Sequence, residues 1–366
     1  MSATEEALTP MERHSAADLP LVDGHLDLAE SVTLFGRDLT VPSVERRAIE
    51  RRTSQVATVS LPDLERGGVA VVAATVTAGF LAADVGADFE PRSALYHTRE
   101  EAEAQALSQI ALYEEWQRQG RVRLLKSAAD LHDHLELWRQ DHKPGLVLLM
   151  EGADPILSVR DLPRWWDRGL RMIGITYGDT VYGRGVAGGS TKVTPGGLTS
   201  EGFALLDAMA DQGFIWDISH LTEGGIHEGL ERGFPRVCAS HANARALTPT
   251  DRHLSDGVIR AVGERGGVMG LVLYNAFIEP RWRADRSITV TLAEHLRRHA
   301  EHIAGIAGWD HVGIGSDLDG GLGRDESPAE IDTVADLWKI GEVVPAEARD
   351  AVLSTNWLRF FRASLP

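Results

Sequence analysis

The stretch FIWDISHLTEGGIHEGLERGFPRVCASH, residues 214–241, shows one pattern twice. A short apolar run ends at His220, a helical pattern follows, and a second apolar run ends at His241. Runs this short and this apolar are typical of parallel strands that are buried on both faces. A single histidine at a strand end is more often structural than catalytic. The stretch therefore predicts a strand–helix–strand unit and leaves the role of His241 open.

The rest of the chain repeats this unit. Six further apolar runs are separated by helical patterns, at residues 19–27, 69–76, 146–152, 171–178, 267–274 and 311–320. Thr98 with Glu101 forms a capping-box signal before one helix, and Thr291 with Glu294 does so before another. Eight strands that alternate with helices predict an α/β fold, a TIM-like (β/α)8 barrel, with a doubly wound open sheet as the lesser alternative.

The domain organisation predicted from the sequence is simple. No repeat, low-complexity tract or Pro/Ser-rich linker divides the 366 residues, so we expect a single catalytic barrel domain over residues 1–366. Residues 28–60 and 275–290 are interpreted as loop excursions that are too short for independent domains. Residues 1–18 are expected to form a loosely ordered extension.

Composition and charge restrict the class of partner. A formal net charge of −17 disfavours nucleic acid and anionic membrane surfaces, which repel an acidic protein. No run of about 18 apolar residues occurs, and residues 1–20 lack the apolar core of a signal peptide. The one cysteine, Cys238, lies in an apolar run and is interpreted as a small buried hydrophobic residue. We therefore expect a cytoplasmic protein with a small-molecule substrate and no nucleic-acid or membrane partner.

Five of the eight runs end in residues that can bind a metal ion or move a proton. These residues are His25 with Asp27, then Glu151, His220, His241 and Asp317. In a barrel they would converge on the carboxyl ends of the strands, where active sites of this fold lie. Structural residues scattered without a common role would not repeatedly choose that end. The repetition therefore favours a functional role for His241.

The residue types at these strand ends suit a metal centre. Imidazole nitrogen and carboxylate oxygen are ligands for zinc or a similar transition metal. His25 and Asp27 are two residues apart, so on a strand their side chains share one face. The number of ligands exceeds the need of one ion, and a bridging carboxylate would hold a second ion about 3.5–4 Å from the first. Glu151 is the expected bridge.

With these motifs in place, the chain resembles the membrane (renal) dipeptidase family of zinc metallopeptidases, a branch of the amidohydrolase-like barrels. The resemblance covers nearly the whole length and includes LVDGHLDL, LMEGADP, CASHANARAL, GIGSDLDG and STNWLRFFR. It implies two divalent metal ions per chain, most simply zinc. One ion would be bound by His25, Asp27 and Glu151, and the other by Glu151, His220 and His241. The resemblance also allows a homodimer.

The same resemblance assigns roles to two further residues. Asp317 matches the acidic residue that handles the proton of the bridging water and meets the substrate amino group. Arg252 matches the arginine that receives the terminal carboxylate, and a guanidinium suits that anion because it donates parallel hydrogen bonds. The implied activity is hydrolysis of short peptides with a free C-terminus, L,L- and L,D-dipeptides included, by attack of a metal-bridging hydroxide.

One departure from the family concerns the scissile carbonyl. The family usually has a histidine after the fourth strand, whereas this chain reads GITYGDTVYGRG with Tyr177 in that place. A tyrosine can donate a hydrogen bond to an oxyanion, although it is a weaker electrophile than an imidazolium. Tyr182 or Arg184 could substitute, or Tyr177 could be a rim aromatic without a role.

This departure keeps two other hypotheses open. The first is a metal-dependent amidohydrolase for another amide, such as an N-acyl amino acid or a lactam. The second is a catalytically silent binding protein, although the complete ligand set argues against it. Four other histidines are interpreted as packing or surface residues: His295, His299, His302 and His311. Asp319 could support Asp317, and His253 has no clear role.

Overall fold

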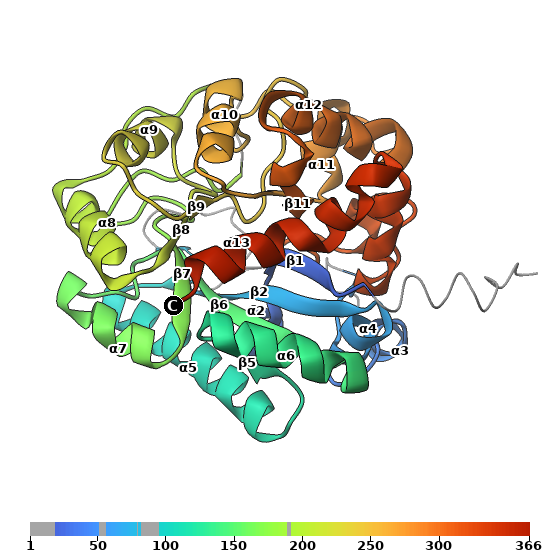
Figure 1. Ribbon diagram of the computed structural model, residues 1–366, viewed down its shortest axis with the longest axis horizontal. Helices are drawn as coiled ribbons and strands as arrows, with labels where there is room; N and C mark the ends of the chain where they lie inside the picture. Colours follow the sequence, from blue (N-terminus) through green and yellow to red (C-terminus); the bar gives the residue numbers. More distant parts are fainter. Residues whose placement is uncertain (1–18, 51–55, 79, 82–94, 189–191) are drawn as a thin grey trace, which may run out of the picture.

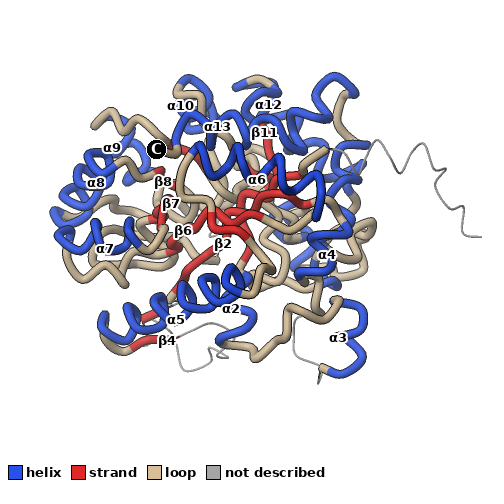
Figure 2. Tube along the Cα trace, turned by 60° about the horizontal axis from the view of Figure 1, so that its bottom comes forward, coloured by secondary structure: helices blue, strands red, loops and turns tan. Residues whose placement is uncertain are grey.

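In the computed structural model, each of the eight apolar runs contains a parallel strand, and these strands belong to one sheet (Figures 1 and 2). The structure describes residues 19–50, 56–78, 80–81, 95–188 and 192–366. The sheet order is β10-β11-β1-β2-β6-β7-β8-β9. The strands are β1 (Leu21–Leu26), β2 (Val69–Thr77), β6 (Gly145–Glu151), β7 (Leu170–Gly174), β8 (Ile215–Asp217), β9 (Val237–Cys238), β10 (Met269–Leu271) and β11 (Val312–Ile314).

The sheet curves back on itself at β9 and β10. Ala239 and Met269 form a parallel bridge there, and the Gly270 amide donates to the Ala239 carbonyl at 2.9 Å. The barrel is therefore nearly closed, and the predicted TIM-like barrel is confirmed in place of the open sheet. Outside it, β5 (Arg123–Leu124) pairs with β6, and β3 (Phe80–Leu81) pairs with β4 (Leu95–Tyr96).

Helices surround the strands (Figure 2). They are α2 (Leu28–Thr33), α3 (Ser43–Ile49), α4 (Leu61–Arg66), α5 (Arg99–Arg118), α6 (Ala128–Asp141), α7 (Leu162–Asp167), α8 (Ser200–Gln212), α9 (Glu223–Glu231), α10 (Asp256–Glu264), α11 (Asn275–Ile278), α12 (Arg297–Ala307) and α13 (Asn356–Ser364). The 3-10 and π segments are η2 (Val159–Asp161), η3 (Pro280–Arg283), η4 (Leu292–Leu296), η5 (Trp309–His311), η6 (Arg324–Glu326), η7 (Val334–Glu342), η8 (Ala346–Ala348) and η9 (Ala351–Thr355).

The helices predicted to begin after Thr98 and after Thr291 are present, and each differs from the prediction in one respect. Thr98 accepts from the Glu101 amide, but the Glu101 carboxylate accepts from the His97 amide and not from that of Thr98. Thr291 accepts from the Glu294 amide, and the helix behind it opens with the π segment η4 before α12. The caps satisfy amides that the first turn of a helix leaves without a partner.

Two helices cover the amino-terminal ends of the barrel strands. In Figure 1, α6 and α13 cross the middle of the barrel, and Trp138 and Trp357 belong to one buried cluster with strand residues. The Trp357 indole donates to the Ile314 carbonyl at 2.8 Å. A Cβ on Gly313 would overlap this indole, so the strand needs glycine there. A layer of packed apolar side chains therefore closes this end of the barrel.

The predicted excursions lie at the other end. Residues 28–60 contain α2 and α3, and residues 275–290 contain α11 and η3. Asp319, which follows β11, connects residues 28–60 to the barrel. Its carboxylate accepts from the Thr58 hydroxyl at 2.7 Å and pairs with Arg37 at 3.2 Å. Residues 1–18, expected to be loosely ordered, lie outside the described residues. Within the described part, no helix combines the length and apolarity that a membrane crossing requires.

Candidate metal-binding active site

The carboxyl ends of the barrel strands bring the six predicted metal and proton-transfer residues together. Parallel strands end at the same edge, which is why residues from β1, β6, β8, β9 and β11 meet there. All six are buried: His25, Asp27, Glu151, His220, His241 and Asp317. Residues nearly 300 positions apart in the chain therefore share one site.

Glu151 lies at the centre of three imidazoles. Its Oε1 is 3.2 Å from His220 Nε2, 3.5 Å from His25 Nε2 and 3.7 Å from His241 Nε2. Within the described residues, neither Glu151 Oε1 nor His25 Nε2 has a hydrogen-bond partner. Buried polar atoms without a partner are costly, and a cation among them would supply the missing interaction.

A second group of donors lies on the other side of His25. Its Nε2 is 3.8 Å from Asp27 Oδ1 and 4.0 Å from Asp317 Oδ1. A Cβ on Gly320 would overlap both carboxylates, so only glycine keeps the space between them open. The Thr75 hydroxyl donates to Asp27 Oδ1 and orients that carboxylate.

Two donor triplets could each hold an ion in the described part of the chain. They are His25–Glu151–His241 and His25–Asp27–Asp317, with donor atoms within 4.8 Å of one another. The resemblance implies a different division, since it places His220 on one ion and leaves Asp317 outside both ligand sets. His220 still lies close, with its Nε2 2.9 Å from His241 Nε2.

The imidazoles are held in the form that binds metals. Burial lowers the pKa of three histidines, His25, His220 and His241, well below the usual range. The side chains are therefore neutral near pH 7, and a neutral imidazole has one nitrogen lone pair free for a cation.

The carboxylates repel one another in the same buried space. Burial, and behind it Glu151, raises the pKa of Asp27 to about 8, and burial raises that of Glu151 to about 8. The pKa of Asp317 is raised well above its usual range by burial and then by Asp27 and Glu151. Arg252 lowers the pKa of Glu151 and Asp317 as a smaller effect. Such an excess of buried negative charge fits divalent cations.

Backbone strain places two of these side chains. His220 and Asp317 have φ of 64° and 59°, in the left-handed region that side chains other than glycine rarely adopt. Asp319, which anchors the excursion at residues 28–60, has φ of 64°. Strain of this kind concentrates at functional sites, where the surrounding structure must hold it in place.

Arg252 is buried beside the imidazoles with unused donors. Its Nη2 lies 3.0 Å from His220 Nε2 and donates to the His241 carbonyl at 3.0 Å. Its Nε and Nη1 have no hydrogen-bond partner, and it forms no ion pair with a carboxylate, among the residues that the structure describes. The neighbouring acids are engaged elsewhere, Asp251 with Thr194 and Asp256 with His302. Arg252 lines the same cleft as the metal donors.

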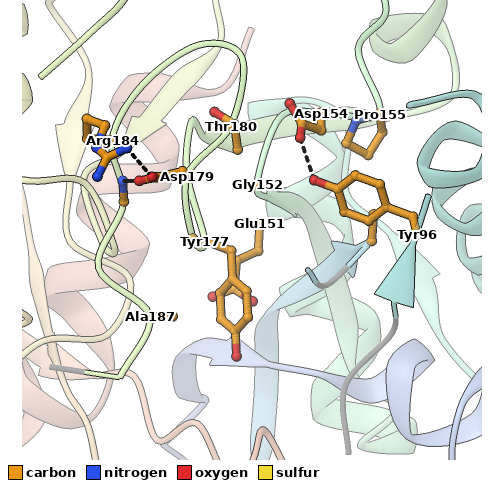
Figure 3. A pocket seen from close by; sticks show the side chains of 13 residues that line it. Tyr96, Glu151, Gly152, Asp154, Pro155, Tyr177, Asp179, Thr180, Arg184 and Ala187 are labelled. Carbon is orange, nitrogen blue, oxygen red and sulfur yellow. Dashed lines mark hydrogen bonds and ion pairs between the residues drawn. The ribbon is translucent and has the colours of Figure 1, made fainter. Parts of the chain in front are cut away.

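Tyr177 separates two hollows. The cleft above the metal donors and a neighbouring pocket, each of about 250 Å³, share three lining residues: Glu151, Tyr177 and Ala187. Figure 3 shows Tyr177 beside Glu151, while Arg184 is turned toward Asp179. The Tyr177 ring lies 4.7 Å from that of His220. Burial raises the pKa of Tyr177 well above its usual value, which keeps the phenol protonated as a donor.

The two alternatives to Tyr177 are occupied with other contacts. The Tyr182 hydroxyl donates to the Ile156 carbonyl and accepts from Arg99 at 2.9 Å. Arg184 pairs with Asp179 and lines only the neighbouring pocket. Tyr177 is therefore the better placed of the three to meet a group bound at the metal donors.

The histidines that were set aside have structural contacts. None of them belongs to the donor triplets found in the described residues. Their rings form hydrogen bonds elsewhere: His253 with the Phe277 carbonyl, His295 with the Thr291 amide, His299 with the Ile278 carbonyl, His302 with Asp256 and His311 with the Gly267 carbonyl. These contacts agree with the packing and surface interpretation of four of them, and they give His253, which had no clear role in the sequence, a structural one.

Two residues near the ligands were not singled out from the sequence. Ser240 contacts the rings of both His25 and His241 and donates to Asp217. Ser240 directly precedes His241, and Asp217 directly follows the strand residue Trp216. Their closeness to His220 and His241 in the sequence was the available signal, but the contact with His25 spans the barrel.

Comparison with known proteins gives consistent matches. The family model described as membrane dipeptidase, peptidase family M19, matches residues 11–363. A crystal structure of a Rhodobacter sphaeroides metallopeptidase with a phosphinate mimic of L-Ala-D-Ala is 25% identical, with TM-score 0.74, over 94% of this chain and 99% of that one. The metallopeptidase dipeptidase AC is 25% identical, with TM-score 0.75, over 95% and 99%. An uncharacterised Klebsiella pneumoniae protein is 33% identical over 66% of this chain and 89% of its own length.

Proposed function

This chain belongs to the membrane dipeptidase family of metallopeptidases, and from that premise we propose that it is a binuclear zinc dipeptidase acting on short peptides with a free C-terminus. The family membership confirms the resemblance seen in the sequence, and with it the class of enzyme, a metallo-dipeptidase. The observation that carries the finer proposal is the buried Arg252, which lines the cleft above the metal donors and has two nitrogens, Nε and Nη1, without a partner among the described residues.

Five residues would hold two zinc ions. His25, Asp27 and Glu151 would bind one, and Glu151, His220 and His241 the other. Glu151 Oε1 and His25 Nε2, which have no partner among the described residues, support a metal site here, as do the neutral imidazoles and the excess of carboxylates. The division of the ligands between two ions rests on the family resemblance. When bound, the ions would polarise the scissile carbonyl and acidify the attacking water.

Arg252 would bind the substrate's terminal carboxylate. A charge-assisted hydrogen bond to a guanidinium is short and strong, and it would compensate the burial of this cation. Because Arg252 Nη2 lies 3.0 Å from His220 Nε2, a carboxylate on the guanidinium would leave little chain between itself and the metal donors. This supports a restriction to dipeptide-length substrates. The dipeptide mimic bound to the Rhodobacter sphaeroides relative supports including L,D-dipeptides.

Asp317 and Tyr177 would act on protons at the scissile bond. Asp317 would accept the proton of the attacking water and pass it to the leaving amine, a task that its raised pKa suits. Tyr177 would donate a hydrogen bond to the developing oxyanion, for which its phenol remains protonated. Asp317 would also meet the substrate amino group.

A substrate screen with metal analysis tests the proposal. The purified protein should contain about two zinc ions per chain, as a carboxylate-bridged site implies, and should hydrolyse L,L- and L,D-dipeptides. His220→Ala and His241→Ala should each lose the second ion and keep the barrel fold by circular dichroism. Two ions retained in both variants would overturn the ligand assignment, and no hydrolysis of any dipeptide would overturn the activity.

A second candidate substrate class follows from Tyr177. Without the family's usual histidine at this position, the site could favour another amide, such as an N-acyl amino acid or a lactam. N-acetylated dipeptides separate the two candidates because they lack the free amino group. They should not react if Asp317 must meet an ammonium group, and they should react if the enzyme is a broader amidohydrolase.

Assembly and location complete the proposal. We infer a homodimer and a cytoplasmic location, the first from the family resemblance and the second from the sequence composition. Sedimentation velocity of the metal-loaded protein tests the dimer, and fractionation of the source cells tests the location.

A further inference from the structure

We propose that the hydroxyl of Ser240 is a shared positioning group that orients His25 and His241 toward their metal ions at the same time. Ser240 is fully buried. Its Oγ lies 3.1 Å from His25 Nδ1 and 2.8 Å from His241 Nδ1. The inference rests on the proposed metal assignment, in which these two histidines bind different ions.

The hydrogen count at this hydroxyl determines which ring nitrogens are protonated. A serine hydroxyl has one hydrogen to donate and two lone pairs to accept. Its hydrogen goes to Asp217 Oδ2 at 2.5 Å, because a carboxylate oxygen can only accept. Oδ1 of the same carboxylate accepts from the Ser240 and Ser219 amides at 2.8 and 3.1 Å. The two lone pairs of Ser240 Oγ therefore accept from the Nδ1–H groups of the two imidazoles.

The tautomers that follow are the ones a metal site needs. With Nδ1 protonated, Nε2 of His25 and Nε2 of His241 carry the lone pairs, and both face Glu151 Oε1 at 3.5 and 3.7 Å. The two rings also pack together with centroids 3.7 Å apart. One hydroxyl thus sets the tautomer and orientation of a ligand for each ion.

His220 does not depend on this hydroxyl. Its Nδ1 is bonded to the Val186 carbonyl at 2.9 Å, which fixes its tautomer separately. The remaining polar contact of Ser240 Oγ, with Ser219 Oγ, is longer at 3.3 Å. Partners behind a ligand typically contribute 10–100-fold to metal affinity, so the loss of one shared partner should weaken both ions.

The barrel contains a matched control after another strand, β11. Ser316 is also fully buried, and its Oγ donates to Asp23 Oδ2 at 2.5 Å while its amide donates to Asp23 Oδ1 at 2.8 Å. These bonds reproduce those between Ser240 and Asp217. In the described residues, however, the hydroxyl of Ser316 contacts no histidine ring. Replacing it removes the same serine–aspartate bond and no contact to a ligand's ring. The bond from the His25 amide to Asp23 Oδ1, at 3.2 Å, does not involve the Ser316 hydroxyl.

The experiment compares zinc affinity in Ser240→Ala and Ser316→Ala, measured by competition with a chromophoric chelator. Urea unfolding of the metal-free forms provides the structural control. Ser240→Ala should lose tenfold or more in affinity for both ions, whereas Ser316→Ala should stay near wild type. Both should lose similar metal-free stability. Ser240→Thr, which retains the hydroxyl, should restore most of the affinity.

A second variant keeps the test decisive if Ser240→Ala does not fold. In Asp217→Asn, the amide oxygen stays on the two backbone N–H groups, so the NH₂ faces Ser240 Oγ and uses one of its lone pairs. One imidazole then loses its acceptor, and zinc affinity should fall relative to the matched variant Asp23→Asn.

The outcomes separate this inference from the proposed function. Wild-type affinity for both ions in Ser240→Ala, or equal losses in Ser240→Ala and Ser316→Ala, would overturn the shared positioning role and leave the dipeptidase proposal standing. A wild-type protein that binds no zinc would instead overturn the proposed function.

Discussion

The two ends of the barrel differ in what they bury. At the amino-terminal end, α13 buries Trp357 and Phe361, whose rings stack with centroids 5.4 Å apart, against the strands. At the carboxyl end, the same strands bury imidazoles and carboxylates around Glu151. Burial of aromatic surface stabilises the fold, whereas burial of ionisable groups without full compensation destabilises it.

Stability and chemistry are therefore concentrated at opposite ends of the barrel. The apolar end is held mainly by close packing, with single bonds such as that from the Trp357 indole to the Ile314 carbonyl. The polar end needs strained backbone at His220 and Asp317 and a network of outer hydrogen bonds to hold its groups in place. Substitutions at the two ends should therefore have opposite profiles, as expected for a barrel that separates a stability face from a functional face.

The largest effect should come from Glu151→Gln. Loss of the bridging charge should remove zinc and abolish dipeptide turnover, because both proposed ligand sets include this carboxylate. The metal-free variant should nevertheless be more stable than the metal-free wild type near pH 8, since it no longer buries this charge. Zinc content, turnover and urea unfolding measure the three effects. A metal-free variant that is less stable than the wild type would contradict the contrast between the ends.

Trp357→Ala should show the reverse profile. Removing a buried tryptophan should lower the free energy of unfolding by about 3–5 kcal/mol. At a temperature where the variant remains folded, its zinc content and kcat/KM should stay close to wild type. Thermal unfolding and steady-state kinetics test this. If turnover falls as far as stability does, the two ends are not separable.

Arg252→Ala should affect one substrate class selectively. The variant should keep its zinc and lose about 10²–10³-fold in kcat/KM for free dipeptides, because a charge-assisted pair is lost. Dipeptide amides, which lack the carboxylate, should be poor substrates already and lose little more. Measuring acid and amide in both proteins completes the cycle. Equal losses for both would assign Arg252 a structural role.

Asp317→Asn should keep both ions and reduce turnover by about 10²-fold or more, the usual contribution of a positioned proton shuttle. The amide is similar in shape and cannot accept the proton. Steady-state kinetics with metal analysis of the same sample test this. Turnover near wild type would leave Asp317 with a structural role only.

The smallest expected effect is a pH dependence of the rise in Tm that zinc produces. Asp27 and Glu151 have pKa values raised by burial to about 8 in the metal-free fold, so this fold binds their protons more tightly than the unfolded chain does. The stability that those protons contribute is complete below about pH 4 and is lost as the pH rises through about 8. Zinc replaces the protons, and the rise in Tm on adding zinc should therefore grow between about pH 6 and 8. Glu151→Gln should flatten this trend, and a trend of opposite sign would refute it.

Much of the fold could be predicted because its signals are local. Apolar runs of strand length, helix caps such as Thr98 and regular alternation depend on neighbours in the chain, and together they predict a barrel. The residue at the end of each apolar run could also be identified from the sequence, so His25, Glu151 and His241 could be placed at one edge of the barrel from topology alone. Zinc chemistry followed from their residue types.

The tertiary structure decided what depends on distances across the barrel. Ser240 contacts His25 although 215 positions separate them, and no local pattern reports such a contact. Arg252 could have paired with Asp251 or Asp256, and only the packing shows that its Nε and Nη1 have no partner among the described residues. The physical reason is the range of each interaction. Periodicity and capping act within a few residues, whereas hydrogen-bond partners at the centre of a barrel are set by strands that are distant in sequence and adjacent only once the sheet curves back on itself.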